Sequence, residues 1–465
     1  MKPYKNHFTG IFCLLALLLG SCSSKDTLLE SVPFDAEAVA TFNFIELATE
    51  SGITIENGRL ALPDEYAAFR SEIPSDLLKN AGLLAEAVDL ENVVFFGYIN
   101  RGETFATATV TDIDALRSLL RSLEMERDTD NGYEVYDNRV IISPDDNQVW
   151  ICDSKKPVDR IEDFKLARKK NNILRYQGLA DVLTSGNMGN FVIDQSALGS
   201  GFDQYWSAGH ISIENNSILL SGTSMKTDGT IIEQDGFLEP VSTDFLRYMP
   251  SNFIFASAAG IKSGSKLFAS LTDAAGKNKH VLNQIPANVK ESIRQINGTV
   301  AFGFGPKSKQ SLLNPASPDQ WQALLMVHLP QSTINEITEN LHSSLGDGGR
   351  TENGLYRFNS REFNLVYGSV DGYLTIAAGM DVAPDNSNSF TGDFTGKKFA
   401  TVFQTPVLSS IVNDPSMEFS IKAYLDLNGS ASRLQISLVG TEKPIIPTLV
   451  STIPTFIQRY GELAR

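Results

Sequence analysis

The sequence predicts an α+β protein of two tandem related domains, each a mostly antiparallel sheet with helices packed on one face. Two observations carry this prediction. Short runs of β-branched and aromatic residues alternate with amphipathic segments. A similar succession of segments also occurs twice, at a separation of roughly 220 residues. A chain of 465 residues is too long for one ordinary hydrophobic core, which suggests at least two domains.

The most distinctive part of the repeat is an Asn-Gly turn. Asn131 and Gly132 stand before strand-like alternation in the first half, and Asn353 and Gly354 do so in the second. Asn-Gly tolerates the positive φ angles of a tight turn. We therefore expect the two turns to form hairpins at equivalent places in the two domains.

An amphipathic helix precedes each of these turns. Apolar residues recur at helical spacing over 113–123 and over 334–345. Asp112 stands at the N-cap position of the first helix, and Thr333 with Glu336 has the spacing of a capping box for the second. The sequence thus predicts where both helices begin.

Further segments match in the same order, although the number of residues that separates the two members of a pair changes along the chain. The matched pairs are Val32–Asp35 with Met249–Asn252, Ala38–Phe44 with Phe253–Ala259, Val93–Ile99 with Val300–Phe304, and Ile218–Thr223 with Ile436–Thr441. Within the first copy the expected strands include Phe105–Val110, Glu134–Tyr136, Arg139–Ile142 and Gln148–Cys152. The preserved order predicts a duplication, with a first repeat over 30–230 and a second over 245–465.

The N-terminal residues have the pattern of a secretory signal. Lys2 and Lys5 precede an apolar run over 8–18, which is too short to span a bilayer as a mature helix. A basic start, a short apolar run and a small-residue cleavage site are typical of such signals. We expect the signal peptide to cover residues 1–21.

The end of this signal resembles a bacterial lipoprotein box. Cys22 follows Leu19, Gly20 and Ser21 directly. The resemblance implies cleavage before Cys22 and a diacylglycerol on its sulfur. We expect a polar tether over 22–29, and a membrane attachment through this lipid.

The charge balance of the chain is strongly acidic. Without Lys2 and Lys5, 37 basic residues face 55 acidic ones, which gives a balance of −18. Such a charge argues against nucleic acid as a partner, and against anionic lipid through general electrostatics.

Cysteine usage leaves one thiol in the mature chain. Cys13 lies in the signal and Cys22 is the proposed lipid site, so only Cys152 remains and no intramolecular disulfide is expected. Cys152 ends the apolar run 149–152. We interpret it as a small buried hydrophobic side chain rather than a reactive thiol.

The first residues after the signal resemble a known family. Val32–Val39 has the pattern Val/Ile-Pro-x-Asp-Ala-x-x-Val, and Glu46–Gly52 has the pattern Glu-Leu-Ala-x-x-Ser-Gly. With the lipoprotein box, these segments are similar to Bacteroidetes cell-envelope lipoproteins that carry a domain of unknown function. The resemblance implies an envelope lipoprotein, which we place in the outer membrane with the facing side left open. It implies no catalytic residues.

The sequence contains few of the residue patterns that enzymes need. The histidines of the mature chain are His210, His280, His328 and His342. No two of them have metal-ligand spacing, and neither His-Glu-x-x-His nor Gly-x-Ser-x-Gly occurs. We therefore assign no catalytic residue, no metal and no cofactor from the sequence.

Two short motifs are candidates for modification and ligand contact. Asp26, Thr27 and Leu28 resemble the acceptor sequence of Bacteroidetes protein O-glycosylation, which makes Thr27 a candidate site. Tyr205 and Trp206 lie among glycines and would stack on a sugar ring if exposed, but a partly buried loop anchor is the better interpretation.

These observations favour a non-enzymatic envelope lipoprotein, a binding or scaffolding module for an envelope protein or a glycan. The alternative is a carboxylate-dependent glycan or peptidoglycan hydrolase, because acidic residues are plentiful and such a pair leaves no local motif. A third hypothesis is a purely structural assembly partner. Ligand, facing side and oligomeric state stay open at this stage.

Overall fold

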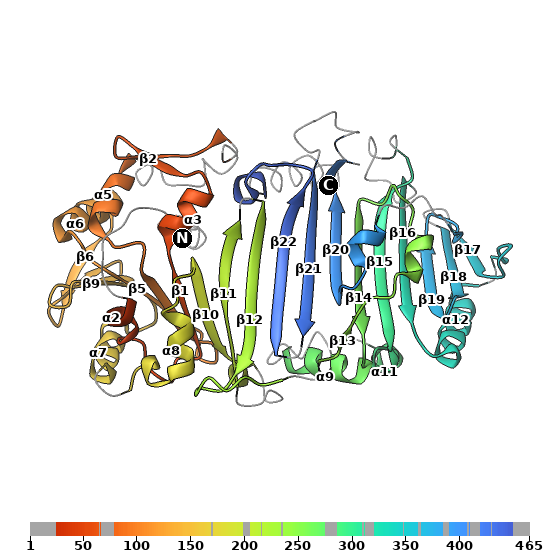
Figure 1. The fold of residues 1–465 in the computed structure, drawn as a ribbon, viewed down its shortest axis with the longest axis horizontal. Coiled ribbons are helices and arrows are strands. Elements are labelled where there is room, and N and C mark those ends of the chain that lie inside the picture. Colours follow the sequence, from red (N-terminus) through yellow and green to blue (C-terminus); the bar gives the residue numbers. More distant parts are fainter. Residues whose placement is uncertain are drawn as a thin grey trace. The chain divides into compact units, whose positions relative to one another are not determined.

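The computed structural model contains helices and extensive antiparallel sheet, so the protein is α+β (Figure 1). It describes residues 25–64, 66, 79–168, 171–198, 205–214, 216–233, 236–274, 286–308, 311, 320–346, 348–360, 364–384, 390–406, 409, 419–428 and 430–449. The chain divides into two compact units. Unit 1 holds the described residues up to 233 together with 443–449, and unit 2 holds those from 236 to 442.

The sheet of unit 1 is antiparallel throughout and follows the order β12-β11-β10-β1-β4-β5-β9-β8-β7-β6. Its strands are β1 (Ala38–Phe42), β4 (Val93–Tyr98), β5 (Glu103–Thr109), β6 (Arg127–Asp130), β7 (Tyr133–Tyr136), β8 (Val140–Ser143), β9 (Gln148–Asp153), β10 (Gly189–Asp194), β11 (Trp206–Glu214) and β12 (Ser217–Met225). A separate hairpin joins β2 (Thr54–Glu56) and β3 (Arg59–Ala61).

Helices cover both faces of this sheet, so the prediction of helices on one face is wrong for unit 1. The helices and short 3-10 turns are α2 (Lys25–Leu29), α3 (Phe44–Glu50), α5 (Ala81–Ala87), α6 (Ile113–Ser122), α7 (Pro157–Ala167), η2 (Ile173–Arg175), α8 (Gln177–Leu183) and η3 (Gln195–Leu198). One core contains α3, α5 and α6, and the other contains α2, α7 and α8. Phe95 packs against the first core and Phe96 lies in the second. Adjacent residues of a strand point to opposite faces, so β4 is buried on both sides.

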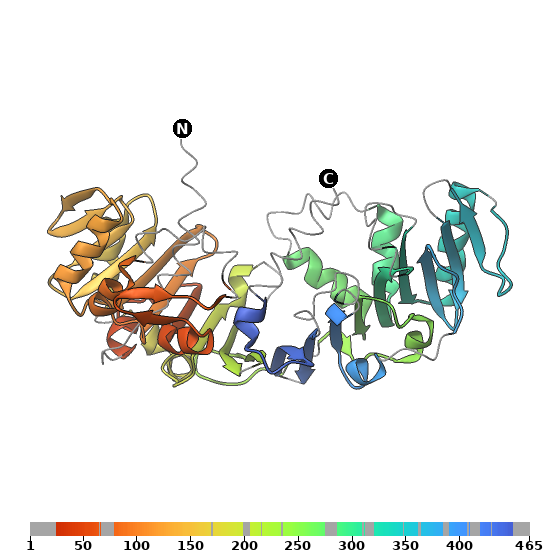
Figure 2. The same ribbon diagram turned by 90° about the horizontal axis from the view of Figure 1, so that it is seen from above.

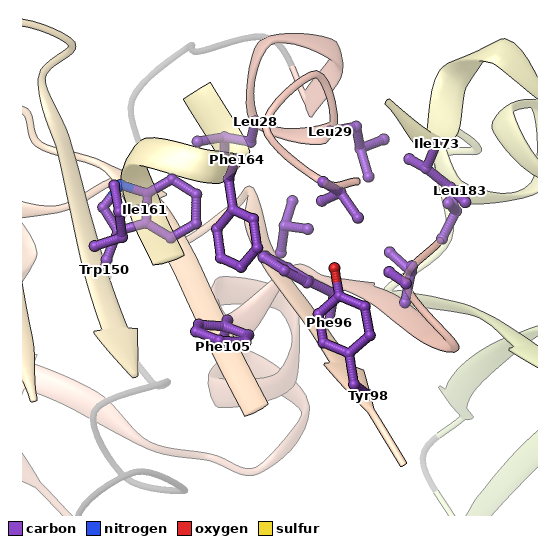
Figure 3. Close-up of a cluster of buried hydrophobic side chains, with 14 of the residues drawn as sticks. Leu28, Leu29, Phe96, Tyr98, Phe105, Trp150, Ile161, Phe164, Ile173 and Leu183 are labelled. Carbon is purple, nitrogen blue, oxygen red and sulfur yellow. The ribbon is translucent and has the colours of Figure 1, made fainter. Parts of the chain in front are cut away.

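Figure 3 shows the second core, in which aromatic rings pack around α7. Phe164 lies edge-on to Phe105, with ring centroids 4.9 Å apart, and close to Trp150 at 6.0 Å. Leu28 and Leu29 of α2 also enter this core and are fully buried. The expected tether over 22–29 is therefore wrong for 25–29, because two adjacent leucines hold this segment against the sheet as a helix.

The sheet of unit 2 follows the order β22-β21-β20-β14-β15-β16-β19-β18-β17 and is also antiparallel. Its strands are β14 (Phe255–Ile261), β15 (Gly298–Pro306), β16 (Trp321–His328), β17 (Tyr356–Asn359), β18 (Asn364–Val370), β19 (Tyr373–Ala378), β20 (Phe399–Gln404), β21 (Ser420–Asn428) and β22 (Ala431–Val439). The short β13 (Leu238–Glu239) pairs with the end of β14.

Helices lie on both sides of the unit 2 sheet as well. They are η4 (Asp244–Tyr248), α9 (Gly264–Ala274), α11 (Ala287–Gln295), α12 (Gln331–Leu345) and α13 (Thr391–Phe394). Phe245 of η4 and Phe394 of α13 pack into the main core of this unit. The green helices α9 and α11 lie on the opposite side of the sheet (Figure 2).

Both sheets have the same pattern of strand pairing. A central strand, β1 or β14, pairs on one side with β4 or β15 and on the other side with β10 or β20. In unit 1 the helix α6 connects β5 to the edge strand β6. In unit 2 the helix α12 connects β16 to the edge strand β17. The segment 443–449, which the sequence analysis placed in the second repeat, belongs to unit 1, where Ile446 packs against a core.

The turns and helix starts follow the sequence in most places. Asn131 and Gly132 both have positive φ and join β6 to β7, and Gly354 has positive φ in the turn before β17. The carboxylate of Asp112 caps α6 as expected. The capping box at Thr333 is wrong, because α12 begins earlier, after Pro330.

A candidate binding face on unit 2

Alternation along the strands of unit 2 produces one packed face and one open face. Ala256, Ala301 and Leu324 point into the main core of this unit. The side chains between them point to the other face. On β14, β15, β16 and β20 these include Phe255, Ser257, Ala259, Val300, Phe302, Phe304, Trp321, Ala323, Leu325, Val327, Phe399, Thr401 and Phe403. None of these side chains is charged, and all are apolar except Ser257 and Thr401, whose hydroxyl groups hydrogen-bond to each other at 2.8 Å.

Four aromatic side chains form a continuous row on this face. The rings of Phe255 and Phe304 are stacked, with centroids 5.3 Å apart. Phe302 lies 6.1 Å from Phe255 and 5.9 Å from Phe304, and Trp321 lies 6.2 Å from Phe304. Phe302 is nevertheless 40% exposed. The four rings therefore lie close together, with Phe302 exposed and the other three partly buried.

Helices α9 and α11 do not bury this face. Among their described side chains no apolar one is buried, and Leu271 and Val289 are 44% and 42% exposed. In unit 1 the helices α3 and α5 follow the equivalent strand, β1, and they bury five apolar residues. These are Phe44, Ala48, Ala81, Leu84 and Ala87. Among the residues that the structure describes, the helices at this position in the strand order are thus packed in unit 1 and loosely packed in unit 2.

Some exposed apolar side chains lie on the same side of the sheet as this face, on the helices α9 and α11 (Figure 2). Leu271, Val289 and Phe302 are three of the seven large apolar side chains that are exposed in the described part of the chain. Single exposed apolar residues are normal, whereas a group of them next to half-buried aromatic rings marks an interaction site.

The residues that the sequence singled out lie elsewhere. Cys22 and the signal peptide are outside the described residues. Thr27 is exposed on α2, and its carbonyl oxygen accepts a hydrogen bond from Arg168 at 3.4 Å. The neighbouring Leu28 is fully buried, so the folded chain offers only part of the glycosylation motif to an enzyme.

Trp206 does not form a platform for a sugar, because it is buried in a core of unit 1. Its burial contradicts the ligand-contact hypothesis, and its place at the start of β11 also differs from the loop that we expected. Tyr205 precedes β11, is partly exposed, and accepts a hydrogen bond on its carbonyl oxygen from the amide of Gln195. Cys152 is buried on β9 as expected, and burial raises the pKa of its thiol to about 12.

A polar network around His210 was missed by the sequence analysis. Nδ1 of His210 lies 2.8 Å from Oδ1 of Asn190, which in turn accepts a hydrogen bond from Ser185 at 2.6 Å. The amide nitrogen of Asn190 donates to Thr41 at 3.0 Å, and Lys25 donates to the carbonyl oxygen of Ser185 at 3.1 Å. Burial lowers the pKa of His210, which favours its neutral form.

The fold does not require this network. In unit 1 the strand register places Thr41 opposite Asn190 and Asn190 opposite His210. The corresponding pairings in unit 2 join Ala258 with Ala400, and Ala400 with Tyr424. Since alanines fill the same inner positions there, the polar groups of unit 1 are specific to that unit. No sequence motif marks them, because they come from three distant strands and a turn.

Within the described ranges, no cluster of three or more His, Cys, Asp or Glu side chains could hold a metal ion. Among the same residues, no helix combines the length and the apolar composition that crossing a bilayer requires.

Comparison with known proteins gives no family. No family model and no curated protein matches the chain. Two solved structures, crystal forms IV and III of TP0453, are similar over 46% of this chain and over 97% and 99% of theirs. Their sequence identities are 12% and 11% and their TM-scores are 0.24 and 0.22. Values this low carry no argument about fold or function.

Proposed function

We propose that this protein is a non-enzymatic lipoprotein of the cell envelope that binds an apolar ligand on the open face of unit 2. The aromatic row is the observation that carries this proposal. Phe302 stays 40% exposed between ring neighbours, while the helices beside it leave Leu271 and Val289 exposed too. Each such side chain gains roughly 1 kcal/mol or more when a partner removes it from water.

The anchoring part of the proposal rests on the sequence. The lipoprotein box at Cys22 places the chain at a membrane, most simply the outer membrane. The α2 helix starts at Lys25, so only Ser23 and Ser24 separate the body from the anchor. Two intervening residues span at most about 11 Å between the flanking Cα atoms, which keeps the body close to lipid.

We also propose that the two units are tandem related domains. The shared strand order supports this, as do the matching segments before the central strands, where Pro33 and Pro250 precede β1 and β14 by the same number of residues. In such a duplication, unit 1 supplies a fully packed domain, while the open face of unit 2 is available for binding.

A neutral environment-sensitive dye, Nile red, tests the binding face. We expect its fluorescence to rise with the full chain carrying Cys22→Ser, and to fall when Phe302 becomes Ser. The matched control is Ile99→Ser, because Ile99 is exposed to the same degree as Leu271 but lies in unit 1. Equal dye binding by the wild-type and Phe302→Ser proteins would refute the proposed face.

No observation favours the hydrolase alternative. The buried carboxylates of the described chain are Asp89 and Glu134. Asp89 accepts a hydrogen bond from the backbone amide of Glu91, and Glu134 is paired with Arg117 and Arg127. Both carboxylates therefore hold local structure together.

A further inference from the structure

The helices on the side of the open face lie in a basic part of an acidic chain. Between Lys262 and Lys309 the sequence has eight Lys and Arg residues and only two acidic ones, Asp273 and Glu291. The whole chain has a net charge of −16. Charges separated by more than about 8–10 Å are largely screened at physiological salt. A local basic group can therefore attract an anion that the whole chain would repel.

Helix α11 carries an apolar stripe and a basic stripe next to each other. Val289 and Ile293 are one helical turn apart, and so are the neighbouring Lys290 and Arg294. The apolar stripe continues to Ile296, which packs near α12. The basic stripe therefore runs along the border of the apolar one.

Arg294 connects the basic stripe to the apolar part of α9. Its guanidinium lies over the ring of Phe268, 4.3 Å from the centroid. Its ion pair with Glu291, at 3.3 Å, joins two exposed side chains and is therefore weak. A guanidinium whose carbon lies over a ring still has N–H groups that can donate to phosphate oxygens.

We propose that the ligand of the open face is an anionic phospholipid. Its acyl chain contacts Phe302, Leu271 and Val289, and its phosphate lies at Lys290 and Arg294. This inference rests on the proposed function and names the ligand class for the same face. A phospholipid matches both halves of the site, because the open face offers uncharged contacts and α11, on the same side of the sheet, carries the positive charges (Figure 2).

The tryptophans of the chain allow a direct test. There are three: Trp321 lies in the aromatic row, and Trp150 and Trp206 are buried in a core of unit 1. Full-length protein with Cys22→Ser is mixed with vesicles of brominated phosphatidylcholine, with or without brominated phosphatidylglycerol. We expect quenching of tryptophan emission that is stronger with phosphatidylglycerol and that disappears in Trp321→Phe.

Charge reversal then tests the phosphate position. The variant Lys290→Glu with Arg294→Glu should weaken binding to phosphatidylglycerol vesicles by roughly tenfold or more. The control variant Lys155→Glu with Lys226→Glu changes the net charge equally, at exposed positions of unit 1, and should bind as the wild type does.

The outcomes separate the two proposals. If Nile red binds at Phe302 but quenching is the same with and without phosphatidylglycerol, the proposed face holds and the anionic ligand is wrong. If the control variant weakens binding as much as the α11 variant, the phosphate does not lie at Lys290 and Arg294. If neither Nile red nor brominated lipid responds to changes on the face, the proposed function fails as well.

Discussion

Leu28 and Phe245 occupy the same place before the central strands of the two units. Leu28 precedes β1 by as many residues as Phe245 precedes β14, and both side chains are fully buried. Each begins a pair of buried apolar residues, completed by Leu29 and Leu246. Unit 1 therefore starts within a few residues of Cys22.

Substitution of Leu28 tests whether α2 is part of the core. Leu28→Ala should lower the free energy of unfolding by about 2–5 kcal/mol, because it leaves a cavity beside the aromatic rings of unit 1. Thr27→Ala, at an exposed position of the same helix, should change it by less than about 0.5 kcal/mol. Urea unfolding curves compare the two variants. An unchanged urea midpoint for Leu28→Ala would show that this segment is a tether and not part of the core.

The hairpin at Asn131 and Gly132 depends on backbone conformation. Gly132 has φ +84°, where a side chain is strained, so Gly132→Ala should cost about 1 kcal/mol of stability. Gly186→Ala is the matched control, because no heavy atom lies within 4 Å of its added Cβ and its φ is not positive. Chemical unfolding measures both. Equal stability of the two variants would show that the turn is not under this constraint.

The polar network gives unit 1 a dependence on pH. Since burial lowers the pKa of His210, the unfolded chain takes up a proton at a higher pH than the folded chain. Stability should then fall as pH drops below about 6.5, and level off below the folded pKa. His210→Gln keeps a donor for Asn190 and lacks this titration. The difference in unfolding free energy between wild type and variant should shrink from about pH 8 to about pH 5; a constant difference would contradict the lowered pKa.

Lipidation at Cys22 is tested by removing the sulfur. We expect Cys22→Ala either to move the protein from the detergent phase to the aqueous phase or to leave it uncleaved with its signal peptide, since the diacylglycerol supplies the two acyl chains that are enough for stable attachment. Mass spectrometry of the wild-type N-terminus should show the added lipid. A Cys22→Ala protein that still enters the detergent phase, with an unchanged processed mass, would show that the anchor lies elsewhere.

Much of the sheet could be predicted from the sequence, because β-branched and aromatic runs such as Val93–Ile99 and Phe105–Val110 mark strands directly. The N-cap at Asp112 was equally visible, because capping is local. The start of α12 was not, because Pro330 supplies a helix start that competes with Thr333. Local residues decide these features.

The open face could not be predicted, because coverage is a tertiary property. Phe302 and Phe304 alternate with Ala301 and Gly303, a pattern that defines two faces but not which one a helix covers. The His210 network depends on the register that brings Asn190 beside it, which no spacing in the sequence reveals. The burial of Trp206 could not be predicted for the same reason, because nearby glycines do not indicate whether a side chain is buried or exposed.

Photo-crosslinking at Phe302 in living cells tests the central claim most directly. A photoreactive phenylalanine analogue replaces Phe302, and the same analogue at the exposed Leu166 of unit 1 serves as the control. After irradiation, mass spectrometry of the purified protein identifies what is attached. The account predicts phospholipid adducts at position 302 and few at position 166. Adducts only to protein at position 302, or equal lipid adducts at both positions, would contradict it.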